Sequence, residues 1–177
     1  MIITIVLFIF LFFALGLLFV IGTACWGFWV TRVPYVRSNR TDTQRLLRSL
    51  SLRPGAFFYD LGSGDGRVLF MAESILSVRG VGFELTWWTY LHARAKKLIK
   101  KSSVEFIRKN FFSESWANAD VVYCFLYPPL MRSVEEKFLH DCKPGTILVS
   151  RDFPLPTLRP QEIVDFTHPH NAYIYKK

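Results

Sequence analysis

The chain has 177 residues, 51% of them hydrophobic, and its 22 Lys and Arg residues outnumber its 14 Asp and Glu residues. Residues 1–31 contain no charged side chain, so every one of these charges lies in the remainder, which is long enough to bury one hydrophobic core. This pattern excludes a disordered chain, a disulfide-rich scaffold and a transporter with several membrane spans.

The first predicted element is a transmembrane helix over residues 1–30. About 20 apolar residues cross the hydrocarbon core of a bilayer, and the segment lacks the positive start, short apolar run and cleavage site of a signal peptide. The first positive side chains, Arg32, Arg37 and Arg40, follow it. The positive-inside rule therefore places the N-terminus outside and the rest of the chain in the cytoplasm. No Arg-rich transit segment is present, which favours a bacterial inner membrane over the mitochondrial inner membrane.

Two later stretches are strongly basic. Residues 32–53 hold six arginines and one aspartate, and residues 94–109 hold seven basic residues and one glutamate. Anionic lipid headgroups are the expected partner of the first stretch. Nucleic acid is disfavoured, because no stacking or groove-reading motif accompanies the charge. The second stretch is expected to be the solvated face of a helix whose buried stripe comprises Trp87, Leu91, Ala95 and Leu98.

The remaining predicted elements alternate between helices and strands. Such alternation predicts an α/β sheet with right-handed crossovers. The chain then divides into an anchor (1–30), a basic arm with the first helix (31–55) and a domain (56–177). Strands are expected at 56–61, 80–85, 104–110, 120–126, 146–150, 162–166 and 172–176, and helices at 41–52, 67–78, 86–101 and 129–141.

Three glycines, Gly62, Gly64 and Gly66, lie within five residues between the first of these strands and a helix. Glycine lets the backbone turn tightly and approach a ligand, and ligands of open α/β sheets bind beyond the carboxyl ends of the strands. Glu84 follows at the end of the next strand, where a carboxylate can accept both hydroxyls of a ribose. The pattern predicts a ligand that contains a nucleoside.

Two classes of cofactor compete for this site. A dinucleotide site requires a third glycine where the chain has Arg67, and Asp60 and Asp65 would repel a pyrophosphate. S-adenosyl-L-methionine carries an ammonium and a sulfonium, which favour acidic residues at these positions. We therefore expect S-adenosyl-L-methionine rather than a nicotinamide or flavin cofactor.

No metal site is predicted. Cys25, Cys124 and Cys142 lack Cys-x-x-Cys spacing, which also favours a reducing compartment. His168 and His170 form a pair without an acidic or cysteine companion, as is usual for turn or surface residues.

From Pro34 to Pro160 the chain resembles the small class I methyltransferases that carry the sequence Asp-Leu-Gly-Ser-Gly-Asp-Gly-Arg. These include membrane-anchored protein-lysine methyltransferases of the mitochondrial ADP/ATP carrier and of the ATP synthase c subunit, together with prokaryotic relatives, and the hydrophobic anchor is also similar. The resemblance implies a Rossmann-like class I methyltransferase sheet with helices on both faces. The matching segments are residues 34–36, 60–67, 82–85 with Trp88, 119–122, 143–145 and 152–156.

The same resemblance implies roles for individual residues. Glu84 would bind the ribose, and Leu85 and Phe111 would flank the adenine. Asn110 would bind the adenine amine, at a position where Asp is commoner in the family. The methionine end would be held by Asp60, Gly62, Ser63, Gly64 and Gly66.

Tyr35 and Tyr127 are the candidates for lining the acceptor pocket. Residues 126–129, Leu-Tyr-Pro-Pro, are similar to the N/D-P-P-Y motif of amino methyltransferases of nucleic acids, but Tyr127 replaces the Asn or Asp and no aromatic residue follows the prolines. A phenol here could orient an amine or contact the sulfonium by cation–π attraction. The alternatives are a structural turn for Tyr127 and a packing role for Tyr35. Asp152 is expected either to hold the incoming ammonium or to lie on the surface.

The sequence thus predicts a membrane-anchored methyltransferase that acts on lysine of a membrane or membrane-associated protein by in-line transfer. A sulfonium is an activated electrophile, so positioning and desolvation supply most of the catalysis. A low-dielectric pocket beside a cationic cofactor lowers the pKa of lysine from its reference value of ~10.4. The alternatives are methylation of a lipid, a quinone or RNA, and a module that only binds S-adenosyl-L-methionine.

Overall fold

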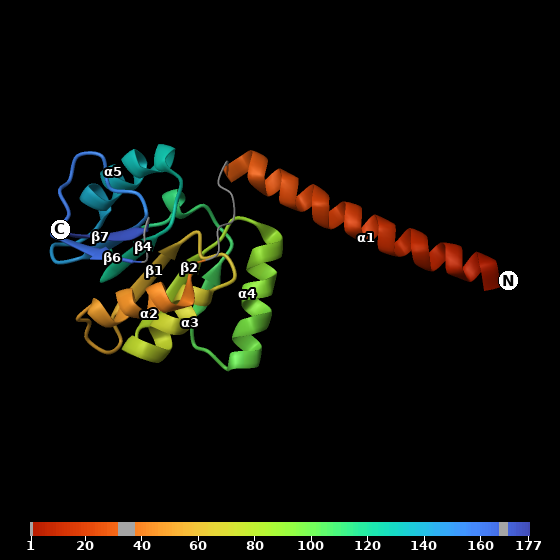
Figure 1. Cartoon of the computed structure of the whole chain (residues 1–177), viewed down its shortest axis with the longest axis horizontal. Coiled ribbons are helices and arrows are strands. Elements are labelled where there is room, and N and C mark those ends of the chain that lie inside the picture. Colours follow the sequence, from red (N-terminus) through yellow and green to blue (C-terminus); the bar gives the residue numbers. More distant parts are fainter. Residues whose placement is uncertain (1, 32–37, 167–169) are drawn as a thin grey trace.

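The computed structural model describes residues 2–31, 38–166 and 170–177, with the side chains of residues 3–22 in the first helix (Figure 1). Tyr35 and His168 therefore lie outside the described residues. The first helix, α1 (Ile2–Thr31), projects away from the rest of the chain. Its segment Ile3–Gly22 is long and apolar enough to cross a membrane and makes no buried contact with the domain.

The domain is built on one sheet of seven strands in the order β3-β2-β1-β4-β5-β7-β6. The first five strands are parallel, and β7 runs antiparallel to both of its neighbours, β5 and β6. The chain builds outward from β1 through β2 to β3 and then returns to place β4 on the other side of β1. Ligands of such sheets bind where the strand order reverses, which here is at the carboxyl ends of β1 and β4. The strands are β1 (Phe57–Leu61), β2 (Arg79–Phe83), β3 (Glu105–Ile107), β4 (Val121–Cys124), β5 (Ile147–Arg151), β6 (Glu162–Asp165) and β7 (Asn171–Lys176).

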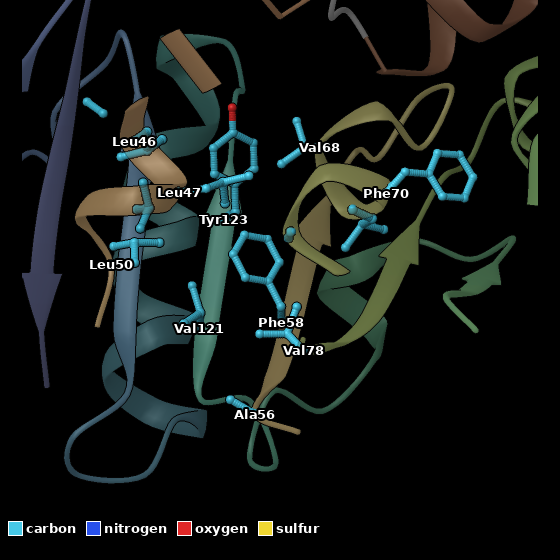
Figure 2. Packing of buried hydrophobic residues seen from close by; sticks show 14 of the residues in the cluster. Leu46, Leu47, Leu50, Ala56, Phe58, Val68, Phe70, Val78, Val121 and Tyr123 are labelled. Carbon is cyan, nitrogen blue, oxygen red and sulfur yellow. The ribbon is translucent and has the colours of Figure 1, made fainter. Parts of the chain in front are cut away.

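Helices cover both faces of this sheet, so its central strands are buried on both sides and read as nearly continuous apolar runs. Figure 2 shows the first face, where leucines of α2 and side chains of α3 pack against Phe58 and Tyr123. On the other face α5 packs Val134 and Phe138 against Val122. The helices of the domain are α2 (Arg40–Ser49), α3 (Arg67–Leu76), α4 (Trp87–Lys100) and α5 (Met131–Asp141), with short 3-10 helices η1 (Phe111–Ser113) and η2 (Pro128–Leu130).

The predicted fold class is confirmed, but the expected buried stripe of α4 is wrong. The buried residue of α4 is Ala93, whereas Trp87, Leu91 and Leu98 are exposed. Helix α4 contacts β3 at the edge of the sheet, and Lys96 of α4 pairs with Asp65 in the loop after β1. The apolar side of α4 faces away from the core.

Candidate functional site

The glycine-rich turn connects β1 to α3 at the point where the strand order reverses. Gly62, Gly64 and Gly66 all have positive φ angles, of 79°, 53° and 76°. The backbone N–H groups of Gly62 and Ser63 both donate to the carbonyl of Phe83, at 2.9 Å each, and so join the turn to the end of β2.

Gly66 cannot be replaced without displacing its neighbours. A Cβ atom at this position would lie 2.4 Å from the ring of Phe106 and 3.0 Å from that of Phe70, and the residue has a left-handed φ. Gly55 has a similar φ of 78°, but nothing lies within 4 Å of the Cβ position there. Substitution of Gly55 therefore tests backbone strain alone, whereas substitution of Gly66 tests strain together with steric overlap.

We expect Gly66→Ala to lower the free energy of unfolding by about 2–4 kcal/mol, because overpacking adds to the strain of a left-handed residue. Gly55→Ala is expected to cost only about 1–2 kcal/mol, the strain alone. Urea denaturation of both variants checks this expectation. Equal losses would show that the Phe106 ring moves away freely and that close packing is not the reason for glycine at 66.

Asp60 is a buried carboxyl group, 3% exposed, at the carboxyl end of β1. Burial, and then the negative charges of Glu84 and Asp65, raise the pKa of Asp60 from 3.8 to about 8. Within the described part of the chain, no Lys, Arg or His pairs with it. An anion in such surroundings is stabilised by a cation, so the site is suited to a positively charged ligand.

Asp65 lies nearby but differs from Asp60, because side chains of the protein itself compensate its charge. Its carboxylate accepts a 2.7 Å hydrogen bond from Lys96 Nζ and a 3.2 Å bond from the backbone N–H of Arg67. Burial alone would raise the pKa of Asp65, but the hydrogen bonds and charges of Lys96 and Arg67 together outweigh it, and the pKa is lowered. Asp65 therefore anchors the start of α3 to α4.

Glu84 holds the glycine turn from the end of β2. Its Oε2 accepts from Gly64 N–H at 2.9 Å and its Oε1 accepts from Thr86 N–H at 2.7 Å. A carboxylate has about four acceptor positions, so each oxygen retains one for a further donor. The side chain is thus pre-oriented to accept two hydroxyl groups.

Leu85, Asn110 and Phe111 follow the ends of two neighbouring strands. Phe83 of β2 is opposite Ile107 of β3, so the residues beyond them emerge at the same edge. Leu85 and Asn110 are exposed, and the half-buried ring of Phe111 lies 4.5 Å from that of Phe112. Asn110 Oδ1 already accepts from Phe112 N–H at 3.0 Å, which aligns its amide at the start of η1.

Tyr127 follows β4 and is 48% exposed, directly before η2. It makes no side-chain hydrogen bond that caps η2. Asp152 is partly buried: its carboxylate lies 2.9 Å from His170 Nδ1, and 12% of its side chain is exposed.

Tyr123 and Arg151 belong to this edge but were not predicted. Tyr123 is opposite Asp60 in the sheet, and burial raises the pKa of its hydroxyl. Arg151 is buried between the rings of Phe125 and Phe166 and pairs with Asp42 of α2 at 3.3 Å. The sequence feature that could have indicated these two residues is a polar side chain, tyrosine or arginine, near the end of an otherwise apolar strand.

Across the described ranges, no group of three or more His, Cys, Asp or Glu side chains is arranged to hold a metal ion.

Comparison with known proteins identifies relatives over most of the chain. Residues 60–162 match the family model described as ANTKMT methyltransferase domain. The adenine nucleotide translocase lysine N-methyltransferase of Mus musculus is 34% identical over 135 residues, which cover 75% of this chain and 58% of the mouse protein. A protein-lysine N-methyltransferase of Saccharolobus islandicus (strain REY15A) is 30% identical over 155 residues, covering 83% of this chain and 95% of that protein. The chain thus spans somewhat more than half the length of the mouse relative.

Solved structures agree with this assignment. The chain is similar to an RNA methyltransferase from Salinibacter ruber in complex with S-adenosyl-L-homocysteine, with a TM-score of 0.76, 28% identity and coverage of 80% of this chain and 93% of that one. A SAM-dependent methyltransferase from Geobacter sulfurreducens, also with S-adenosyl-L-homocysteine, shares the fold at a TM-score of 0.58 and 21% identity over 68% of this chain and 52% of that one. The predicted resemblance and the cofactor class are confirmed. The chain belongs to the ANTKMT methyltransferase domain family of S-adenosyl-L-methionine-dependent methyltransferases.

Proposed function

We propose that this protein is a membrane-anchored methyltransferase that transfers a methyl group to lysine of a membrane or membrane-associated protein. Two relatives that support the acceptor are named lysine N-methyltransferases, one of adenine nucleotide translocase and one of protein lysine. The observation that carries the cofactor site is the buried carboxyl group of Asp60, which lacks a cation among the described side chains and lies where the strand order reverses.

The methionine end of the cofactor is assigned to the turn after β1. Asp60 would hold the ammonium, because a cation relieves the repulsion from Glu84 and Asp65. The buried hydroxyl of Ser63 has no hydrogen-bond partner among the described residues and is available to the cofactor. Gly62, Gly64 and Gly66 would admit the ligand close to the backbone.

The nucleoside end is assigned to the ends of β2 and β3. Glu84 would accept the two ribose hydroxyls with the acceptor positions that Gly64 and Thr86 leave free. Leu85 and Phe111 would flank the adenine, and the Asn110 amide would face its amine. All three positions lie at one edge of the sheet, as binding to one planar base requires.

S-adenosyl-L-methionine supplies a methyl group on a positively charged sulfur. The residues of this chain then have to position an uncharged lysine amine in line with it and exclude water. Tyr127, Tyr35 and the newly found Tyr123 are the candidates for that pocket. An apolar, aromatic environment also favours the neutral form of the amine.

Tyr127 offers a direct test of the acceptor pocket. We expect Tyr127→Ala to lower kcat about tenfold, the effect of one hydrogen bond or cation–π contact, with the Kd of the cofactor unchanged. Recovery of kcat in Tyr127→Phe would assign the contribution to the ring, and failure to recover would assign it to the hydroxyl. If Tyr127→Ala has full kcat, the residue is only part of a turn.

The anchor is assigned to α1, and the division into residues 1–30, 31–55 and 56–177 is part of the proposal. The apolar helix ends directly before the basic residues of the arm, which supports a domain on the cytoplasmic side and an N-terminus outside. A bacterial inner membrane is the favoured location, with the mitochondrial inner membrane as the alternative.

The proposed function is tested by transfer of radiolabelled methyl from S-adenosyl-L-methionine to a membrane extract. We expect a protease-sensitive band that yields methyl-lysine on hydrolysis and is absent with Glu84→Ala. Glu136→Ala, an exposed carboxylate on α5, is the matched control and is expected to label normally. Label that is extracted by organic solvent and resists protease would replace lysine by a lipid or quinone as acceptor. Cofactor binding without transfer to any fraction would leave a binding-only module.

RNA methylation is the second candidate, because the solved relative from Salinibacter ruber is described as an RNA methyltransferase and the net charge is +8. Nuclease-sensitive label in the same experiment would establish it. Protease-sensitive, nuclease-resistant label would reject it.

A further inference from the structure

Helix α4 presents an apolar face to the outside of the domain. Trp88 is 55% exposed, Leu98 78% and Ile99 82%, and Leu91 is also exposed. Ala93 is the buried residue of the helix and packs into the core beside α3. Large side chains that the core would accept are thus exposed, while a small one faces the core.

The exposed residues form one continuous stripe. Trp88, Leu91, Ala95 and Leu98 recur at intervals of three and four, so they lie along one side of an α-helix. At about 100° per residue this side is opposite Ala93. Single exposed apolar residues are common on soluble proteins, but a contiguous stripe with tryptophan marks a contact surface.

Basic residues flank this stripe. Arg94 on α4 and Lys101 directly after the helix are exposed, and residues 94–109 contain seven basic side chains and one acidic one. The guanidinium of Arg108 lies 5.0 Å from the centre of the Trp87 ring, so charge and aromatic surface occur together. An apolar face with tryptophan and leucine between basic residues is typical of a helix that lies at the surface of an anionic bilayer.

The position of α4 agrees with such a contact. Figure 1 shows α4 on the side of the domain from which α1 projects, with its axis running across the direction of α1, and the two helices are neighbours. Only nine peptide steps separate Thr31 from Arg40, which limits the connection to about 30 Å. A domain tethered so closely to a membrane-spanning helix remains next to the bilayer surface.

We propose that the outer face of α4 lies on the anionic surface of the bilayer that α1 spans, an inference that rests on the proposed membrane anchor. Glu84 and Leu85 lie directly before Thr86, the N-cap of α4, so this contact brings the rim of the cofactor site to the level of the lipid headgroups. The acceptor is then a lysine at the membrane surface of a membrane protein, within reach of the headgroup region.

Site-directed spin labelling of the full chain in lipid nanodiscs tests the contact. A nitroxide is attached to Leu98→Cys in a Cys25→Ser background, since Cys124 and Cys142 are buried. The matched control is Ile163→Cys on the edge strand β6, an exposed position at the opposite edge of the sheet. Accessibility to oxygen and to a water-soluble nickel complex is measured at both sites.

In discs containing phosphatidylglycerol, the label at 98 is expected to be several-fold less accessible to nickel and more accessible to oxygen than the label at 163. Phosphatidylcholine discs and high salt should weaken this difference, because the basic flank is screened or lacks its partner. Equal accessibility at the two sites would overturn the proposal. Protection at 98 that appears only after a membrane-protein fraction is added would also overturn it and assign the face to a protein.

A second pair of variants separates this inference from the proposed function. Leu98→Glu with Ile99→Glu is expected to retain cofactor binding and methylation of detergent-solubilised acceptor but to lose methylation of the acceptor in its membrane. Ile163→Glu should behave as wild type in both assays. Equal methylation of the membrane-bound acceptor by both variants would overturn the contact. If wild type labels no protein, the proposed lysine methylation fails, while the spin-label result still decides where α4 lies.

Discussion

Binding of S-adenosyl-L-methionine at pH 7 is expected to release about one proton from the wild-type protein, and none from Asp60→Asn. With a pKa raised to about 8, Asp60 is mostly protonated at pH 7. A bound ammonium favours the carboxylate, so the proton is lost on binding. Calorimetric titration in two buffers of different ionisation enthalpy measures the release.

The same substitution is expected to weaken cofactor binding by about a hundredfold or more, because loss of one partner of a buried ion pair costs about 3–5 kcal/mol. Glu136→Gln, an exposed position on α5, is the control and should change neither the affinity nor the proton release. Unchanged affinity in Asp60→Asn would remove Asp60 from the cofactor site.

Asp60 also determines part of the pH dependence of stability. Its pKa rises from 3.8 to about 8 on folding, so between these values the folded state binds more protons than the unfolded state. This group therefore lowers the free energy of unfolding as pH rises from about 4 to about 8. The pKa values of Asp65 and Asp141 are lowered instead, so these residues act below this window.

Cofactor-free Asp60→Asn is accordingly expected to lose less stability than wild type between pH 5 and pH 8, since an amide does not titrate. Urea denaturation at the two pH values gives the comparison. Parallel curves for the two proteins would mean that Asp60 is charged in the folded state without a ligand.

Glu84→Ala is expected to weaken cofactor binding by about a hundredfold or more and to destabilise the protein. Two hydrogen bonds from ribose hydroxyls to a charged group contribute about 1.5–3 kcal/mol each. The N–H groups of Gly64 and Thr86 also lose their acceptor, at about 1–3 kcal/mol for each one left buried and unpaired. Titration calorimetry measures the first effect and thermal unfolding without cofactor measures the second.

Glu84→Gln separates these two roles. Its amide retains one oxygen acceptor, so partial recovery of stability is expected, but its nitrogen cannot accept from a second N–H or hydroxyl group. Tight binding by Glu84→Ala despite a lower melting temperature would leave Glu84 as a loop anchor alone.

Local patterns in the sequence determined the order of strands and helices and the position of the cofactor turn. Continuous apolar runs such as residues 120–126 predicted strands buried on both faces, and β4 lies within that run. Three glycines between a strand and a helix, with Glu84 after the next strand, located the turn and its carboxylate partner. These features depend on residues that are close together along the chain, so they can be predicted from one sequence.

The tertiary structure decided which of two similar acidic residues lacks a compensating cation and which side of α4 faces outward. Asp60 and Asp65 lie five residues apart, but Lys96 reaches only Asp65 among the ion pairs of the described residues. The structure also exposes the residues of α4 that the sequence pattern assigned to the core. Helix rotation and pKa both depend on side chains distant in sequence, so they are determined only when the elements pack together.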